Sequence, residues 1–359
     1  EPQFATQLGS GGSTGNFTTR SAQDCSGPFG KDMPPILQHR PSGTPVPDFL
    51  VMAAPFTPFK SNGDVNTAAI LPLAALFKET LGVNAVWVMG MRGQYDALST
   101  FERKAVAEAW VHAGRAHRLF VIIQVGDSCQ RRAAEMAAHA EQMGADAIGA
   151  LGPYEELCSN TKCVVDFLAP VGAAAPKTPF FYYHTPGWNG KGLNGVKMYD
   201  WFQLAATAIP TAVGVKFESY DDGEFAQTCK QYGSTKLMLY APCDSLGHWE
   251  QKTPGRGAFI QAFLAPMCHR IRAAFQRGDT AAMRAELSFR DGCQNAGGNF
   301  IERYFYAGFG KGMDMGHPRP PQPRATTSEL ATMNRTLHSC GFFKQSWPSA
   351  STNEYTYIV

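Results

Sequence analysis

Short apolar runs alternate with amphipathic helical patterns from residue 49 to residue 263, and this alternation limits the possible folds more than any other feature. Seven runs read as strands buried on both faces, as the strands of a parallel sheet are: residues 49–56, 84–90, 119–126, 146–153, 179–186, 211–218 and 236–242. A weaker eighth run, GAFIQAF, covers residues 257–263. We therefore predict an α/β fold of the (β/α)8 TIM-barrel type rather than an open doubly wound sheet.

The helical patterns between the runs have recognisable ends. Ser99 and Glu102 have the spacing of a capping box at the start of STFERKAVAEAWVHAG. Gly144 stands where a glycine closes the helix of SCQRRAAEMAAHAEQM. After the eighth run, PMCHRIRAAFQRG and DTAAMRAELSFRDG predict additional C-terminal helices.

Two terminal segments differ from the barrel in composition. Residues 1–47 are rich in Gly, Ser, Thr and Pro, and residues 317–359 begin with HPRPPQPR and continue as a polar stretch with isolated aromatic residues. Neither segment has enough apolar surface for a core of its own. We predict a barrel with C-terminal helices over residues 48–316, flanked by extended N- and C-terminal tails. Ordering such tails costs backbone entropy, so contact with the barrel, a second subunit or another protein must compensate.

Composition and charge disfavour several classes of function. The 359 residues are 44% hydrophobic, which is enough for a large core, but no apolar run has the roughly 18 residues that a membrane span needs. The net charge of +2 gives no electrostatic reason to expect nucleic acid or an anionic membrane as the main partner. The nine cysteines form neither a C-x-x-C pair nor a zinc signature, so we expect reduced thiols in a cytoplasmic protein.

Polar side chains close two of the apolar runs, and the active sites of (β/α)8 barrels lie at the carboxyl ends of the strands. Tyr183 and His184 end the fifth run, and Lys216 ends the sixth. The turn GMRGQ, residues 90–94, comes at the end of the second run. Burial lowers the pKa of a lysine, and the freed amine can attack a carbonyl to form a Schiff base. The alternatives are a structural lysine paired with Glu218 or an aspartate, a rim tyrosine and a structural histidine.

The sequence resembles the N-acetylneuraminate lyase family, within the dihydrodipicolinate synthase group of class I aldolases, in four stretches: LVMAAPFTPFKSNGDVN, VMGMRGQYDALSTFERKAVAEAW, VGAAAPKTPFFYYHTPG and VGVKFES. The resemblance extends from about Phe49 to about Gly316. It implies a TIM barrel with added C-terminal helices, a homotetramer, and chemistry that needs no metal or cofactor. It also implies that Lys216 is the Schiff-base lysine that takes up pyruvate, and that Tyr183 is the proton-transfer tyrosine.

The substrate-binding positions around these two residues depart from the family pattern. The family turn after the second strand reads glycine, serine or threonine, threonine, glycine, glutamate, whereas this chain has Gly90, Met91, Arg92, Gly93 and Gln94. Glu218 replaces a small hydroxyl residue two places after the lysine. The sugar-binding residues after the seventh strand become Ala241, Cys243 and Asp244. Arg92 could bind a carboxylate in place of the lost hydroxyls.

An ion pair between Glu218 and Lys216 would favour the protonated amine, raise its pKa and remove the nucleophile. One hypothesis is therefore a catalytically degenerate barrel that serves as a structural or assembly component through its tails, with a cytoskeletal or ciliary lattice as one candidate assembly. The alternative is an active Schiff-base lyase that cleaves N-acetylneuraminate or a related 2-keto acid sugar to pyruvate and an aldehyde. A sensor that binds a keto acid without converting it is a third possibility, although the same carboxylate contacts are missing.

Overall fold

Eight parallel strands close into a barrel, in the order in which they occur along the chain. The computed structural model describes residues 34–38, 46–153, 158, 160–186, 195–219, 221–233, 235–240, 257–294, 303–304, 313 and 315–344. The strands are β1 (Leu50–Ala53), β2 (Ala85–Val88), β3 (Phe120–Gln124), β4 (Ala147–Leu151), β5 (Phe180–His184), β6 (Ala212–Phe217), β7 (Leu237–Tyr240) and β8 (Gly257–Ile260). Each strand lies within the run predicted for it, so the predicted (β/α)8 barrel is confirmed.

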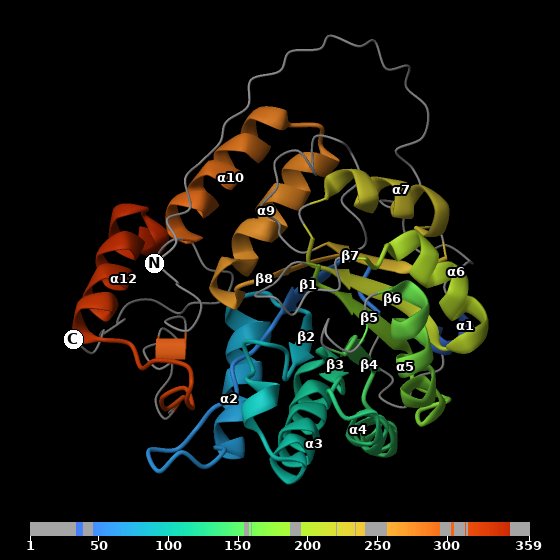
Figure 1. Ribbon diagram of the computed structural model, residues 1–359. Coiled ribbons are helices and arrows are strands. Elements are labelled where there is room, and N and C mark those ends of the chain that lie inside the picture. The colour runs from blue at the N-terminus through green and yellow to red at the C-terminus, as the bar shows by residue number, and fades with distance from the viewer. Residues whose placement is uncertain are drawn as a thin grey trace.

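Helices surround the strands and continue beyond the barrel (Figure 1). They are α1 (Pro35–Gln38), α2 (Ile70–Ala75), α3 (Thr100–His117), α4 (Gln130–Met143), α5 (Thr161–Ala173), α6 (Met198–Ala208), α7 (Asp222–Tyr232), α9 (Ala265–Gln276), α10 (Thr280–Gln294) and α12 (Thr327–Ser339). Short helical turns are η1 (Thr67–Ala69), η2 (Leu76–Thr80), η3 (Tyr95–Ala97), η4 (Ala262–Leu264) and η5 (Phe342–Lys344). Figure 1 shows α9 and α10 side by side above the barrel, with α12 at its edge.

The predicted helix ends are present. The Ser99 side chain accepts a hydrogen bond from the Glu102 backbone N–H, and the Glu102 carboxylate accepts one from the Ser99 backbone N–H, which completes the capping box of α3. Gly144 ends α4 in the left-handed conformation, with φ of 73°. These local signals fix where the helices on this side of the barrel begin and end.

The core has two layers, because alternate residues of each strand point into the barrel and out towards the helices. The inner layer fills the barrel with Leu50, Met52, Ala85, Trp87, Phe120, Ile122, Ala147, Phe181, Tyr183 and Val213. Leu37 of α1, which is 1% exposed, joins this inner cluster. Part of the N-terminal segment therefore contributes to the barrel core.

The C-terminal segment is also attached to the barrel. The Phe59 N–H donates to the Met315 carbonyl over 3.1 Å. The Arg319 guanidinium donates to the Gly63 carbonyl from Nε, over 3.0 Å, and from Nη2, over 2.8 Å, and it forms an ion pair with Glu102 of α3. Helix α12 then follows inside the segment expected to be an extended tail, and the sequence did not lead us to predict it. The proline-rich stretch thus leads from the barrel surface to a further helix.

The expectation of reduced thiols was wrong. Cys158 pairs with Cys163 and Cys293 with Cys340, each pair with Cα atoms 5.6 Å apart, and two further described cysteines are also disulfide-bonded. Cys129 is a free thiol. The sequence spacing of the cysteines did not reveal the Cys293–Cys340 bridge. This bridge joins α10 to the residue after α12, and the two cysteines come close only when the chain folds. Disulfides persist mainly in oxidising compartments, which argues against the expected cytoplasmic location.

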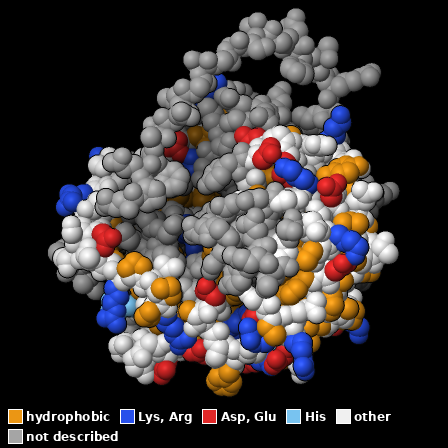
Figure 2. Space-filling view, viewed as in Figure 1, with side chains coloured by type: hydrophobic (Ala, Val, Ile, Leu, Met, Phe, Trp, Pro, Cys, Tyr) orange, Lys and Arg blue, Asp and Glu red, His pale blue; other side chains and the backbone are white. Residues whose placement is uncertain are grey.

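The surface mixes charges of both signs. Figure 2 shows acidic and basic side chains interspersed among the described residues of the face in view. Large apolar side chains exposed in the described ranges are Leu71, Phe101 and Leu204, one each on α2, α3 and α6. In those ranges no helix combines the length and the apolar character needed to cross a membrane.

Candidate active site

Lys216 and Tyr183 lie side by side inside the barrel. They are register partners near the carboxyl ends of β6 and β5. Lys216 is 2% exposed, and its Nζ lies 3.8 Å from the centroid of the Tyr183 ring. The structure thus brings together the two residues expected to form the Schiff base and to transfer the proton.

Trp87 of β2 forms another wall of this site. The centroid of its ring system lies 5.3 Å from Lys216 Nζ and 5.4 Å from the Tyr183 ring centroid. The indole lies over Gly149 of β4, where an added Cβ would come within 2.3 Å of two ring carbons. Only glycine leaves room for the ring there. The sequence did not single out Trp87, because a tryptophan inside an apolar run resembles any other core residue.

Glu218 contacts both members of the pair. Its Oε2 lies 3.7 Å from Lys216 Nζ, and it accepts a short hydrogen bond from the Tyr183 hydroxyl. The Glu218 side chain is 20% exposed, so it lies at the edge of the buried site. The ion pair considered from the sequence therefore exists, and the tyrosine is part of the same network.

Burial nevertheless determines the protonation of the lysine. Loss of solvent lowers the pKa of Lys216 to about 8, against the attraction of Glu218, which raises it, and with a smaller lowering contribution from Arg92. The expectation that Glu218 would raise the lysine pKa above its ordinary value was wrong in its net result. For Tyr183, burial and then Glu218 raise the pKa well above 10, so its hydroxyl keeps its proton. The site combines an amine available near neutral pH with a protonated phenol.

The turn at residues 90–94 has an unusual backbone. Met89, just before it, and Gln94, at its end, have φ of 56° and 52°, a left-handed conformation that is uncommon for residues other than glycine. Gly93 cannot be replaced without rearrangement, because a Cβ there would lie 2.7 Å from the Met89 Cα. The Thr57 hydroxyl donates to the Gly93 carbonyl over 2.6 Å. Backbone strain of this kind clusters at functional sites.

Two side chains of this turn have distinct surroundings. Arg92 is half-buried, lies 5.9 Å from the centroid of the Phe56 ring, and lowers the pKa of both Lys216 and Tyr183 by its charge. Gln94 is 2% exposed; its Nε2 donates to the Arg319 carbonyl over 2.8 Å, and its Oε1 accepts from the Arg319 N–H over 3.2 Å. Gln94 therefore fixes the C-terminal segment, while Arg92 acts electrostatically on the site.

A buried arginine organises the end of β3, and the sequence did not reveal it. Arg103 of α3 is 1% exposed and donates through Nη2 to the carbonyls of Gln124 and Gly126, each over 3.1 Å. Its Nη1 lies 3.1 Å from Asp127 Oδ2. An arginine in a helix with several charged residues carries no sequence signal for this role.

His184 faces away from Lys216. It is 1% exposed, its ring centroid lies 5.1 Å from that of Phe217, and its Nε2 lies 3.7 Å from Glu224 Oε1. It thus has the structural surroundings of the alternative interpretation. Ala241, Cys243 and Asp244 lie outside the described residues. Those residues contain no group of three or more His, Cys, Asp or Glu side chains suited to a metal ion.

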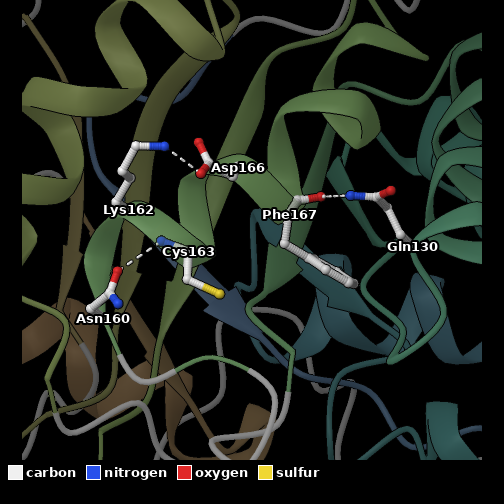
Figure 3. Close-up of a pocket in the computed structure, with 6 residues that line it drawn as sticks. All are labelled: Gln130, Asn160, Lys162, Cys163, Asp166 and Phe167. Atoms are coloured by element: carbon white, nitrogen blue, oxygen red, sulfur yellow. Dashed lines mark hydrogen bonds and ion pairs between the residues drawn. The ribbon is translucent and has the colours of Figure 1, made fainter.

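A separate hollow lies between α4 and α5 (Figure 3). Its polar groups bond to protein partners: Lys162 to Asp166, Asn160 to the Cys163 N–H, and Gln130 to the Phe167 carbonyl. Because the hollow lies between outer helices, we do not assign the chemistry of the barrel to it.

Comparison with known proteins supports the resemblance. The mouse N-acetylneuraminate lyase is 30% identical over 305 residues, which cover 81% of this chain and 92% of the mouse protein. The Xenopus tropicalis N-acetylneuraminate lyase is 34% identical over 234 residues, 65% of this chain and 76% of that protein. The solved N-acetylneuraminate lyase of Aliivibrio salmonicida superimposes with a TM-score of 0.74 at 25% identity, covering 82% of this chain and 97% of that chain.

The family model described as the dihydrodipicolinate synthetase family matches residues 49–309. The match includes every strand of the barrel, the Lys216 and Tyr183 pair and the first C-terminal helices. The fold, the paired residues and the curated relatives agree: the chain belongs to the dihydrodipicolinate synthetase family.

Proposed function

We propose that the protein is an active Schiff-base lyase that cleaves N-acetylneuraminate or a related 2-keto acid sugar to pyruvate and an aldehyde. The observation that carries the proposal is the burial of Lys216 in the barrel, with its pKa lowered to about 8. A group with that pKa is about one-tenth unprotonated at neutral pH. Its surroundings therefore supply a nucleophile despite the neighbouring carboxylate.

The reaction begins when the neutral amine of Lys216 attacks the keto carbon. The resulting carbinolamine loses water, and a protonated imine remains on Nζ. Cleavage of the bond between the α carbon and the hydroxyl-bearing β carbon moves its electron pair towards this imine, so the lysine-bound fragment becomes an enamine and the β carbon becomes an aldehyde. Protonation of the enamine carbon and hydrolysis of the imine release pyruvate and restore the amine.

Tyr183 and Glu218 act as a proton relay in this proposal. Bond cleavage requires the substrate hydroxyl to lose its proton, but the Tyr183 hydroxyl is itself protonated and donates to Glu218. Tyr183 can accept the substrate proton while it passes its own to the Glu218 carboxylate. The same relay run backwards returns the proton to the enamine carbon. Glu218, which replaces a small hydroxyl residue of the family pattern, is thus the final proton acceptor of the relay.

Arg92 is the residue we propose to hold the substrate carboxylate. The hydroxyls of the family turn are replaced by Met91 and Arg92, and a guanidinium can bind a carboxylate through two parallel hydrogen bonds. The proposal is supported by the charge of Arg92, which lowers the pKa of both Lys216 and Tyr183. Its positive charge would also offset repulsion between Glu218 and the incoming carboxylate.

The hypothesis of a degenerate assembly component receives no support from the comparisons, and residues 1–33 and 345–359, on which it largely rests, lie outside the described part of the chain. A homo-oligomer, as the family resemblance implies, stays a proposal that the mass in solution would test. No feature of the described residues favours a cytoskeletal or ciliary partner.

The deciding experiment is borohydride trapping with pyruvate, followed by peptide mass spectrometry. We expect a reduced pyruvate adduct on Lys216 and none in Lys216→Ala. Lys236→Ala is the matched control, because burial also lowers the pKa of Lys236, whose Nζ donates to the Ala212 carbonyl. If the folded wild-type protein gave no adduct on Lys216, the lyase proposal would fail.

A further inference from the structure

Two polar side chains inside the barrel have no hydrogen-bond partner. They are Gln124 of β3, with both Nε2 and Oε1 unpaired, and Trp87 of β2, with its Nε1 unpaired. Both residues are 0% exposed. Buried polar atoms are almost always paired, so three orphan atoms in one interior call for an explanation.

The strand register places both residues around Lys216. In a (β/α)8 barrel the inward side chains form layers from alternate strands. Trp87, Gly149 and Lys216 come from β2, β4 and β6, and the indole indeed lies over Gly149 and close to the lysine. Gln124 of β3 is the register partner of Gly149, and Tyr183 of β5 is the register partner of Lys216. Gln124 and Tyr183 therefore belong to the layer next to Lys216.

The orphan atoms lie near the carboxyl ends of the strands. A Cβ added at Gly126 would lie 3.1 Å from Gln124 Nε2 and 3.2 Å from the Leu151 backbone nitrogen, so the amide lies beyond the end of β3, towards β4. A Cβ added at Gly90 would lie 3.6 Å from Trp87 Nε1, so the indole N–H lies by the turn that follows β2. This is the end of the barrel at which substrates bind.

Hydrogen bonds fix the backbone around Gln124, whereas its buried side-chain amide forms none. Arg103 donates to the carbonyls of both Gln124 and Gly126. A purely structural residue at this position would be an apolar one, because leucine would fill the same space without burying an unpaired amide. Fixed backbone, complete burial and unpaired polar atoms together are the properties of a preorganised binding group.

We propose that the Gln124 amide and the Trp87 N–H form a subsite that binds hydroxyl groups on the carbon chain of the substrate. The amide offers a nitrogen with two N–H donors and an acceptor oxygen, and the indole offers a further N–H donor. A hydroxyl both donates and accepts, so a hydroxylated chain can pair all three atoms. A carboxylate only accepts, which would leave Gln124 Oε1 without a donor. The identity of the chain, a hydroxylated 2-keto acid, rests on the proposed lyase function.

The test measures N-acetylneuraminate binding by calorimetry in the Lys216→Met background, which cannot cleave it, and pyruvate binding by trapping in protein that keeps Lys216. N-acetylneuraminate carries the hydroxylated chain, whereas pyruvate has none. Gln124→Leu should weaken N-acetylneuraminate binding about tenfold, as the loss of paired hydrogen bonds would, and leave half-saturation of pyruvate trapping unchanged. Trp87→Phe keeps a ring over Gly149 and should weaken N-acetylneuraminate binding severalfold. Gln130→Leu, the same substitution at the first residue of α4, is the matched control and should alter neither N-acetylneuraminate binding nor pyruvate trapping.

Stability separates binding from folding. Because the Gln124 side chain bonds to no protein group, Gln124→Leu should melt at the same temperature as the unliganded wild-type protein or higher. Equal N-acetylneuraminate affinity in the Lys216→Met protein with and without Gln124→Leu would overturn the subsite, as would failure of the Lys216→Met protein to bind N-acetylneuraminate. Calorimetry needs no covalent step, so Gln124-dependent binding without pyruvate trapping would reject the lyase and retain the subsite.

Discussion

Glu218→Gln tests whether burial or the neighbouring carboxylate controls Lys216. The distance between Lys216 Nζ and Glu218 Oε2 is 3.7 Å. At that distance two unit charges in an effective dielectric of about 20 interact by about 4.5 kcal/mol. Opposite charges this close usually shift a pKa by about 1 to 3 units. Removing the charge should therefore lower the pKa of Lys216 below its value of about 8.

The lower pKa should accelerate imine formation at neutral pH. At about pH 7 the unprotonated fraction would rise from about one-tenth to half or more, so pyruvate trapping should become about fivefold to tenfold faster. Above about pH 9 most of the amine is unprotonated in both proteins, and the rates should converge. The assay is the initial rate of trapping with pyruvate and cyanoborohydride between about pH 5 and pH 10, within the range in which the protein stays folded.

Carbon–carbon cleavage should respond in the opposite direction. Glutamine keeps a carbonyl that can accept from Tyr183 but cannot take up a proton, so the relay ends and cleavage should slow even as trapping accelerates. Glu224→Gln is the matched control, because Glu224 contacts His184 and not Lys216. Unchanged or slower trapping in Glu218→Gln at neutral pH, with Glu224→Gln behaving as wild type, would refute the assignment of opposing effects to burial and Glu218.

Three further predictions concern stability. Lys216→Met should raise the free energy of unfolding at neutral pH by roughly 3 kcal/mol, as measured by chemical denaturation. The reason is that the pKa of the wild-type lysine falls from 10.5 to about 8 on folding. This difference in stability between the variant and the wild type should disappear as pH rises from 8 to 10.5, the range in which only the unfolded wild-type lysine stays protonated. Arg319→Ala should lower the free energy of unfolding by about 1–3 kcal/mol. The pKa of its partner Glu102 is lowered to about 2, so the contribution of the ion pair, measured in urea titrations, should be full above pH 4.5 and fade towards pH 2. Replacing Cys293 and Cys340 by serine should remove about 4 kcal/mol, because their bridge closes a loop with a sequence separation of 47; an unchanged melting temperature would contradict this.

The barrel was predictable because its signals are local and repeated. Eight apolar runs, helix caps and the order of the elements are all present in the sequence, and even the weak run at residues 257–263 became β8. Helix α12 was missed although Thr326 and Glu329 form a capping box like that of α3, because the proline-rich stretch before it suggested an extended tail. The disulfides were missed because they depend on which elements fold against each other.

The site was partly predictable by one rule, that polar residues ending apolar runs face the mouth of a barrel. The rule identifies Tyr183 and Lys216, and it applies equally to Gln124, the last residue of β3 within the run LFVIIQVG. Trp87 could not be found in this way, since only its fit over Gly149 and its unpaired N–H distinguish it from a core residue. Arg103 needed the folded structure, because the carbonyls it binds lie on a different element.

The state of Lys216 depends on magnitudes that a sequence does not contain. Residue types alone indicated an ion pair with Glu218, and that pair exists. Its effect is outweighed because the amine is 2% exposed, whereas the carboxylate, at 20%, keeps some solvent that screens its field. Moving Glu218 deeper or Lys216 outward would reverse the balance with no change of sequence pattern. A lost family residue beside a catalytic lysine is therefore weak evidence for lost activity until the burial of both partners is known.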